Sequence, residues 1–474
     1  MMNKKLLLIP VLIFVFLLVY SPHFSYQYPF HVDEWNHIEM GMRLFAGDYS
    51  LVGGHFEIGY HFFLGLLSLF GLNLVLFYKF LPALFAVFAS AILFFLMLNL
   101  TKKWTVALAS SILFVSLPTN VNLLGLWFAI PLTFAIPLIY LFFYLFISSE
   151  PGKKNLLLSL LVLLAILLVH PSSGIFVALV ALIYLGVNGK ASKKNFLLIF
   201  IPVIFFGLLA FVWGWQGGFS ETVKFLFGMG IFPNSDLNLP LSLFALLLFG
   251  LIGFVPSLRN RKLRVFCIMF LFALFLFLVS FVFPFTFIAR RPRLVYFAFL
   301  GLVPLSAIGL YKIINFAQTK IKLNAWRILI IGLIILLALS AVFFNYGKQE
   351  QGTELYNLID ENDFEALQFL GSLESGTMVI APLHEAMAVY PISENFVIAD
   401  LHQIDSELKD DMKRFFAVDC EEKARIITRY KNRFGGKYPQ HKTLEVKYVY
   451  SKNSIDCDNL VEVYAYKSYI YRII

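Results

Sequence analysis

Acidic residues are scarce in the first 345 positions of the chain, which hold eight of them beside 23 basic residues. Residues 346–474 reverse the balance with 21 acids and 15 bases, so the two parts carry formal net charges of +15 and −6. Cysteine is also scarce: three occur, without a Cys-x-x-Cys pair or zinc-type spacing. No glycine-rich phosphate loop follows an expected strand. Zinc-ribbon and nucleotide-binding domains are therefore not indicated.

Long apolar runs dominate what is present. Hydrophobic residues make up 59% of the chain, and the mean hydropathy is +0.79. The runs are too long and too continuously apolar for the alternating strands of a membrane barrel. Because backbone polar groups must be paired inside lipid, the sequence predicts an all-α polytopic membrane protein. The basic excess lies in short loops between the runs, where it sets topology, so we expect no nucleic-acid partner.

Basic clusters give one consistent path across the bilayer, because cytoplasmic loops carry an excess of Lys and Arg. About 11 transmembrane helices are expected, with a cytoplasmic N-terminus and an extracytoplasmic C-terminal part, in the plasma membrane of a prokaryote. The first apolar run is read as an uncleaved helix, because Ser21-Pro22-His23 lacks a small-x-small cleavage site. The expected spans are 6–21, 74–98, 104–118, 121–147, 155–169, 172–187, 195–215, 240–256, 265–287, 294–311 and 325–345.

The sequence predicts two domains. A transmembrane domain covers residues 1–345, with a first outer loop at 22–57, a helix in the outer interface at 56–71 and an outer loop at 216–239. An extracytoplasmic soluble α/β domain covers residues 346–474. Its patterns predict helices at 362–373, 404–416 and 421–434 and strands at 377–381, 444–450 and 460–466.

Two cysteines, Cys420 and Cys457, lie in the C-terminal part, whereas Cys267 lies inside an apolar run. An extracytoplasmic domain meets an oxidising environment, in which disulfides persist. On that topology the sequence predicts a Cys420–Cys457 disulfide.

Five of the eight acids gather in one window after the first apolar run: Asp33, Glu34, Glu39, Asp48 and Glu57. Carboxylates near a bilayer are costly, so such a group points to function. A helix beginning near Asp33 would keep this carboxylate ionised through its dipole and place it on one face with His37. Asp33 is then a candidate general base, with Glu34 beside it. The alternative is an N-cap followed by a solvated polar face.

Three arginines, Arg290, Arg291 and Arg293, lie between the ninth and tenth spans, on the outer side in the path above. Cations there run against the positive-inside trend, and planar guanidinium groups suit phosphate. They are candidates for binding an anionic ligand, together with Lys79 near the outer end of the second span. The alternatives are that the arginines are cytoplasmic anchors and that Lys79 snorkels to the interface.

Several histidines and one acid near the outer edges are candidates for lining the site: His37, His55, Glu57, His61 and His170. A divalent cation, Mg²⁺ or Mn²⁺, held by Asp33 and Glu34 is an alternative use of this group, although no compact ligand spacing supports it. No other cofactor is indicated.

A family resemblance follows from the order of these features. One membrane helix precedes His31-Val32-Asp33-Glu34-Trp35, Leu44-Phe45-Ala46-Gly47-Asp48-Tyr49, residues 55–71 and Lys79-Phe80-Leu81-Pro82-Ala83-Leu84. This order resembles GT-C glycosyltransferases, most of all the branch of protein O-mannosyltransferases and lipid A aminoarabinose transferases. The resemblance implies that residues 1–345 form a GT-C-like catalytic domain and that the Asp-Glu pair, Asp33 and Glu34 here, is catalytic.

Two features depart from the family pattern. His55-Phe56-Glu57-Ile58 stands where many relatives have a proline-rich stretch, which leaves the acceptor open. The C-terminal part has no Trp-Trp-Asp motif of oligosaccharyltransferases, which argues against transfer of a whole oligosaccharide to asparagine.

The resemblance implies an inverting glycosyltransferase that moves one sugar from a polyprenyl-phosphate or dolichyl-phosphate donor to a hydroxyl of a glycan, lipid or protein at the outer face. Asp33 would take the acceptor proton, and the arginines, with Lys79, would stabilise the leaving phosphate. A non-enzymatic transporter or flippase of lipid-linked sugars is the first alternative; it predicts charges along a mid-membrane path, where the spans have almost none. A receptor-like protein whose C-terminal part binds a partner is the second.

Overall fold

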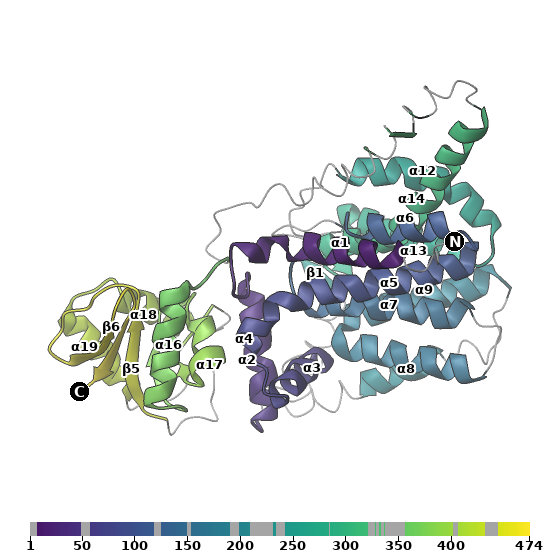
Figure 1. Cartoon of the computed structure of the whole chain (residues 1–474). Coiled ribbons are helices and arrows are strands. Elements are labelled where there is room, and N and C mark those ends of the chain that lie inside the picture. The colour runs from purple at the N-terminus through teal and green to yellow at the C-terminus, as the bar shows by residue number, and fades with distance from the viewer. Residues whose placement is uncertain are drawn as a thin grey trace. The chain divides into compact units, whose positions relative to one another are not determined.

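The computed structural model describes most of the chain and divides it into two compact units. The first unit comprises residues 1–24, 52–60 and 80–351, and the second comprises 25–51, 61–79 and 352–474. Each unit is described by itself (Figure 1). The described residues are 7–48, 57–117, 125–148, 153–189, 199–208, 231–233, 242–283, 285–320, 356–401, 406–431 and 444–474, with single positions at 328, 331, 332 and 336.

The first unit is built from apolar helices. Its described helices are α1 (Leu8–Tyr20), η2 (Ser21–Phe24), α5 (Leu81–Thr101), α6 (Trp104–Phe114), α7 (Pro131–Ser148), α8 (Lys153–Val169), α9 (Pro171–Val187), α12 (Ser242–Arg259), α13 (Arg264–Val282) and α14 (Arg291–Lys320). A short antiparallel pair joins β1 (Ile231–Pro233) to β2 (Phe285–Phe287). Large apolar side chains on these helices, such as Phe275 and Phe281, are exposed, as expected for surfaces that meet lipid.

Glycine sets the closest helix crossing in this unit, between α12 and α14. A Cβ at Gly309 would lie 1.8 Å from the carbonyl oxygen of Phe249, and one at Gly253 would lie 1.9 Å from that of Leu305. Without a side chain at these two positions, the backbones approach closely, as small residues allow in membrane helices.

Three helical stretches are long and apolar enough to cross a membrane: Leu74–Thr101, Arg264–Val282 and Arg291–Lys320. Shorter apolar helices accompany them, including Leu8–Phe24, Pro131–Ile147 and Pro171–Val187. The structure is therefore largely helical and apolar, whereas the number of 11 crossings and their direction stay a prediction.

The helix bounds differ from the expected spans at several ends. α7 begins at Pro131 rather than near 121, because the backbone N–H of Ile130 donates to Thr133 Oγ1 at 3.1 Å and proline suits a first helical turn. α14 extends from Arg291 to Lys320, well beyond the expected 294–311. Only 199–208 of the span expected at 195–215, single positions of 325–345, and only 231–233 of the loop at 216–239 lie within the described residues.

The second unit holds a five-stranded mixed sheet in the order β4-β3-β5-β7-β6. β3 runs parallel to β4 and β5, whereas β7 is antiparallel to β5 and β6. The strands are β3 (Met378–Ile380), β4 (Phe396–Val397), β5 (Val446–Ser451), β6 (Leu460–Ala465) and β7 (Tyr469–Ile473), and the helices around them are α16 (Glu361–Leu373), α17 (Ala386–Ser393), α18 (Ser406–Phe415) and α19 (Cys420–Lys431).

Alternation along the strands gives this sheet two apolar faces. Val379 and Ile470 belong to a core with α16 and α17, whereas Ile380 and Tyr471 belong to a core with α18 and α19. Figure 1 shows α16 and α19 on opposite sides of β5 and β6. The α/β character expected for the C-terminal part agrees with this layout, and the expected helices and strands there match observed ones within a few residues.

The second unit also contains α2 (Val32–Phe45), α4 (Leu74–Phe77) and most of η4 (Tyr78–Phe80), besides residues 61–69 of α3 (Ile58–Leu69). α2 lies in the outer loop expected at 22–57, and α3 lies in the interfacial helix expected at 56–71. The contacts thus group these segments with residues 352–474. The division at residue 345 stays a prediction.

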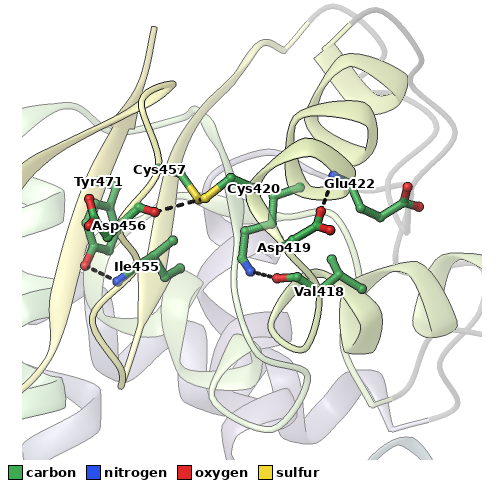
Figure 2. The surroundings of a disulfide bond; sticks show 9 residues. Val418, Asp419, Cys420, Glu422, Ile455, Asp456, Cys457 and Tyr471 are labelled. Carbon is green, nitrogen blue, oxygen red and sulfur yellow. Dashed lines mark hydrogen bonds between the residues drawn. A yellow bond between two sulfur atoms is a disulfide. The ribbon is translucent and has the colours of Figure 1, made fainter.

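A disulfide joins Cys420, at the start of α19, to Cys457 in the loop between β5 and β6, with 5.4 Å between the Cα atoms. Figure 2 shows the surroundings of this bond. Nearby, Asp419 Oδ1 accepts from the backbone N–H of Glu422 at 3.0 Å and caps the helix, and Tyr471 Oη accepts from the backbone N–H of Ile455 at 2.8 Å. These are the two cysteines that the sequence predicted to pair.

Candidate active site

The site begins at the first turn of α2, which is closed by a capping box. His31 is the N-cap residue, and its Nδ1 accepts from the backbone N–H of Asp33 at 3.1 Å. Glu34 Oε2 accepts in return from the backbone N–H groups of His31 at 3.0 Å and Phe30 at 2.8 Å. These bonds satisfy donors that a helix start leaves unpaired, so the local sequence fixes where α2 begins.

Asp33 and Glu34 are neighbours with opposite environments. The Glu34 side chain is buried, with one oxygen occupied by two backbone donors. The Asp33 side chain is 38% exposed, and its Oδ2 lies 3.5 Å from His31 Nδ1. Of the two carboxylates, Asp33 is the one that can reach a substrate, whereas Glu34 holds the helix start.

His37 and His61 form a buried pair. His37 Nδ1 and His61 Nε2 are 3.0 Å apart, a distance at which one ring donates to the other. α2 and α3 approach closely here, because a Cβ at Gly65 would lie 2.0 Å from Phe45 Cδ2. The sequence placed His37 on the face of Asp33, and the pairing with His61 adds a polar contact beside that face.

Asn36 was not singled out from the sequence. It stands three residues after Asp33, on the same side of α2. Its Oδ1 atom is buried and has no hydrogen-bond partner among the described residues. A buried amide oxygen without a donor is costly, so this atom is suited to accept a hydrogen bond from a bound hydroxyl.

The three arginines differ in what they contact. Arg291 donates to Ser280 Oγ at 3.0 Å and to the Ser280 carbonyl at 2.7 Å, and its guanidinium lies 4.7 Å from the Phe281 ring centre. It thereby ties the start of α14 to the end of α13. Arg293 lies 2.5 Å from His170 Nε2, and Arg290 is exposed.

His170 is the N-cap of α9, in the turn after α8, and its Nδ1 lies 2.6 Å from Ser173 Oγ. Because Arg293 can only donate, His170 Nε2 is the acceptor in that contact, and Nδ1 also lies 3.3 Å from the backbone nitrogen of Ser173, whose N–H donates to it. Burial, followed by the charge of Arg293, lowers the pKa of His170 well below its usual value. The ring is therefore neutral at physiological pH and holds the Arg293 guanidinium in place.

The other predicted residues are placed as follows. Lys79 is half-buried in η4, and Glu57 is half-buried in the turn before α3. His55 lies outside the described residues. The carboxylates Asp33 and Glu34 belong to the second unit and the arginines to the first.

An apolar cavity of about 510 Å³ lies between α12, α13 and α14. Its α14 wall includes Val295 and Leu302, on the helix face that begins with Arg291 one turn earlier. Its α13 wall includes Phe270 and Phe277, one turn before Phe281. A hydrocarbon chain fits such a lining, and a guanidinium stands beyond one end of it.

A divalent cation held by Asp33 and Glu34 stays a prediction. Among the described residues, no group of three or more His, Cys, Asp or Glu side chains is arranged to bind a metal. One oxygen of Glu34 is already occupied by two backbone N–H groups. The other Glu34 oxygen and the partly exposed Asp33 carboxylate are the atoms that would hold such an ion.

The fold of the chain is similar to that of an archaeal oligosaccharyltransferase, AglB from Archaeoglobus fulgidus. The complex of that protein with an inhibitory peptide and a dolichol-phosphate matches with a TM-score of 0.56 and 13% identity over 95% of this chain and 70% of that chain. The apo form of an Archaeoglobus fulgidus oligosaccharyltransferase matches with a TM-score of 0.58 and 13% identity over 94% of this chain and 69% of that chain.

A structure of an Archaeoglobus fulgidus oligosaccharyltransferase in complex with Zn and sulfate matches with a TM-score of 0.55 and 12% identity over 93% of this chain and 68% of that chain. No protein-family model matches the sequence, and no curated protein does. At such identities the likeness concerns the fold. It agrees with the GT-C resemblance of the sequence.

Proposed function

We propose that this protein is a membrane glycosyltransferase that uses a sugar donor linked to a polyprenyl or dolichyl phosphate. The observation that carries the proposal is the GT-C-type fold over 95% of the chain, combined with an accessible Asp33 on the first helix after α1. The structural neighbours are oligosaccharyltransferases by name, and one of them was solved with an inhibitory peptide and a dolichol-phosphate. We further propose transfer of one sugar, such as mannose, to a hydroxyl of a protein, glycan or lipid.

Asp33 serves as the general base in this proposal. Its carboxylate accepts the proton of the acceptor hydroxyl as the oxygen attacks the anomeric carbon, and the bond from that carbon to the lipid phosphate breaks with inversion. Asn36 Oδ1 accepts a hydrogen bond from a sugar or acceptor hydroxyl. Glu34 stabilises the first turn of α2 through its capping bonds.

The arginines stabilise the phosphate that leaves. Arg290 is exposed and offers a guanidinium for phosphate, while Arg293, held by His170, provides a second. Arg291 contributes by joining α13 to α14 beside the apolar cavity, which we assign to the isoprenoid chain of the donor. Lys79 remains a proposed partner of the same phosphate.

The outer face of the plasma membrane is the proposed location of the reaction, with the N-terminus in the cytoplasm. The Cys420–Cys457 disulfide supports an extracytoplasmic C-terminal part, because disulfides persist in oxidising compartments. A lipid phosphate is already an activated leaving group, so no nucleotide is required on that side.

The test is a transfer assay with purified protein in liposomes, a polyprenyl-phosphate donor labelled in its sugar, and membrane extracts as the source of acceptor. We expect label in a product that has lost the lipid. The chemical identity of this product shows the class of acceptor. Label that crosses the bilayer while it stays on the lipid would instead establish the flippase alternative. No transfer and no crossing with any donor would contradict the proposal.

A further inference from the structure

One face of α2 packs against the C-terminal residues of its own unit. Val32 and Trp35 share a core with Leu358, Phe364 and Met387, which lie more than 320 positions later in the chain. Helix α17 packs directly on α2. The face continues through Glu39 and Arg43, because positions three and four apart align on one side of a helix.

Arg43 is fully buried on this face, near the C-terminal end of α2. Its Nη1 lies 3.1 Å from Glu39 Oε1, and its other terminal nitrogen pairs with Asp48. The guanidinium carbon lies 5.6 Å from the ring centre of Tyr390 and 5.3 Å from that of Phe396, which are residues of α17 and β4. Two acids and two aromatic rings thus hold one cation.

The other end of α2 is fixed through the backbone. The N–H of Asn357 donates to the Phe30 carbonyl at 2.9 Å, and His31 forms an antiparallel bridge with Tyr356. Tyr26 donates its hydroxyl proton to the Ile359 carbonyl at 2.9 Å. The residue that caps the helix, His31, is therefore paired with the segment that leads into α16.

We propose that residues 356–474 act as the scaffold that positions Asp33, and that Arg43 is the positioning residue of this contact. Asp33 lies between the two fixed points, the bridge at His31 and the Arg43 cluster, and its own side chain remains exposed. Oriented catalysis tolerates little displacement, since an error of about 1 Å can lower a rate about 100-fold. This inference rests on the proposed function.

The Arg43 cluster is suited to fix the position of α2, because the buried cation and the buried acid stabilise each other. Glu39 is 1% exposed, so loss of the guanidinium would leave a buried carboxylate without its partner. Arginine also stacks on aromatic faces through a planar group, which lysine lacks. The scaffold role therefore predicts different outcomes for two replacements of the same residue.

The experiment compares Arg43→Met, Arg43→Lys and the milder Phe396→Leu with the unaltered full-length protein. For Arg43→Met we expect kcat per folded molecule to fall roughly 100-fold with a donor KM within about twofold, and the amides of residues 32–45 to exchange hydrogen faster. Arg43→Lys restores part of kcat, and Phe396→Leu lowers it by roughly tenfold or less, because each keeps part of the cluster.

The matched control is Arg414→Met, which removes an arginine that is 55% exposed and paired with Glu422 in the same unit. It should leave kcat and the exchange of residues 32–45 unchanged. Unchanged kcat and exchange in Arg43→Met, or an equal fall in Arg414→Met, would overturn the scaffold role. If the unaltered protein transfers no sugar, the proposed function fails, and hydrogen exchange still decides whether Arg43 holds α2.

Discussion

The two units differ in whether they bury charged side chains. Among the described residues, the buried Asp, Glu, Lys and Arg side chains all belong to the second unit: Glu34, Glu39, Arg43, Asp363, Asp400, Asp411 and Lys423. In the first unit, buried hydroxyls such as those of Ser110 and Ser306 donate to carbonyls one turn earlier on their own helices. Close backbone contact at glycine, rather than charge, determines how α12 and α14 pack.

The difference follows from the surroundings of each unit. A charge inside lipid is expensive, so the apolar helices pack without it. The second unit buries ion pairs such as Arg43–Glu39, in which each charge has a partner of opposite sign. α2 follows directly after an apolar helix in sequence, yet its contacts place it with the charged unit. The helix that carries the candidate base thus packs on residues far from it in the chain.

We expect the largest effect from a substitution that disrupts the glycine contact between α12 and α14 in the first unit. Gly309→Val places a side chain against the Phe249 carbonyl, which lies 1.8 Å from the position of a Cβ, so α12 and α14 must separate. We expect folded protein to be almost lost, measured as the monodisperse fraction in detergent by size-exclusion chromatography. The control is Gly186→Val in α9, where a Cβ would meet nothing within 4 Å. Equal recovery of both variants would contradict the crossing.

The next effect concerns the disulfide of the second unit. Cys420→Ser removes a covalent link that closes a separation of 37 residues. Removal of a disulfide that closes a loop of this size lowers the free energy of unfolding by about 3 to 4 kcal/mol. We expect the amides of α19 and β5 to lose that much protection in hydrogen exchange, with the helices of the first unit unaffected. Protection that stays within about 0.5 kcal/mol of the unaltered protein would show that the domain does not rely on the bond.

Substitutions of two neighbouring arginines should have intermediate effects that differ in kind. Arg290→Ala removes an exposed guanidinium, so we expect a donor KM about tenfold higher without loss of folded protein, as for one charged hydrogen bond. Arg291→Ala removes the bonds to Ser280 and should lower thermal stability as well. Kinetics with the lipid-linked donor and a detergent melting curve measure both. The assignment fails if Arg290→Ala leaves KM unchanged.

The smallest effect tests a cap in the second unit. Burial raises the pKa of Asp360, but the backbone N–H of Asp363 and the donors of Asn362 outweigh it, so the pKa of Asp360 is lowered. A lowered pKa stabilises the fold above the unfolded pKa, near 3.9, and this contribution is lost as pH falls through the folded value.

Asp360→Ala should therefore lower the stability of α16 by about 1 kcal/mol at neutral pH and by less at pH 3. Hydrogen exchange of residues 361–373 at both pH values measures this. A difference that does not shrink at low pH would contradict the cap.

The sequence predicted the parts of the fold that depend on local pattern. Long apolar runs mark the helices of the first unit, and alternation of apolar and polar residues marks β5 and β6. Both patterns arise within one helix or strand and need no information on its packing partners. It also predicted the cysteine pair and the helix after His31. It did not predict α17 or β7, which are short and take their order from packing on the sheet.

The candidate site was less accessible to sequence reasoning. Asp33 and Glu34 are adjacent acids of similar chemistry, and only the capping bonds to Phe30 and His31 separate an exposed carboxylate from a buried one. The contact of Arg43 with Tyr390 and Phe396 joins positions about 350 residues apart, which no local pattern reveals. The signal that was present is the lone arginine among the acids of the first loop.

The central claim is that Asp33 is the base of sugar transfer from a lipid phosphate. We would measure transfer of labelled sugar from polyprenyl-phosphate donors in membranes that hold equal amounts of the unaltered protein, Asp33→Asn, or Asp410→Asn, which changes an exposed acid of α18. The account predicts a fall of roughly 100-fold or more for Asp33→Asn and none for Asp410→Asn. Transfer by Asp33→Asn at the rate of the unaltered protein would contradict it.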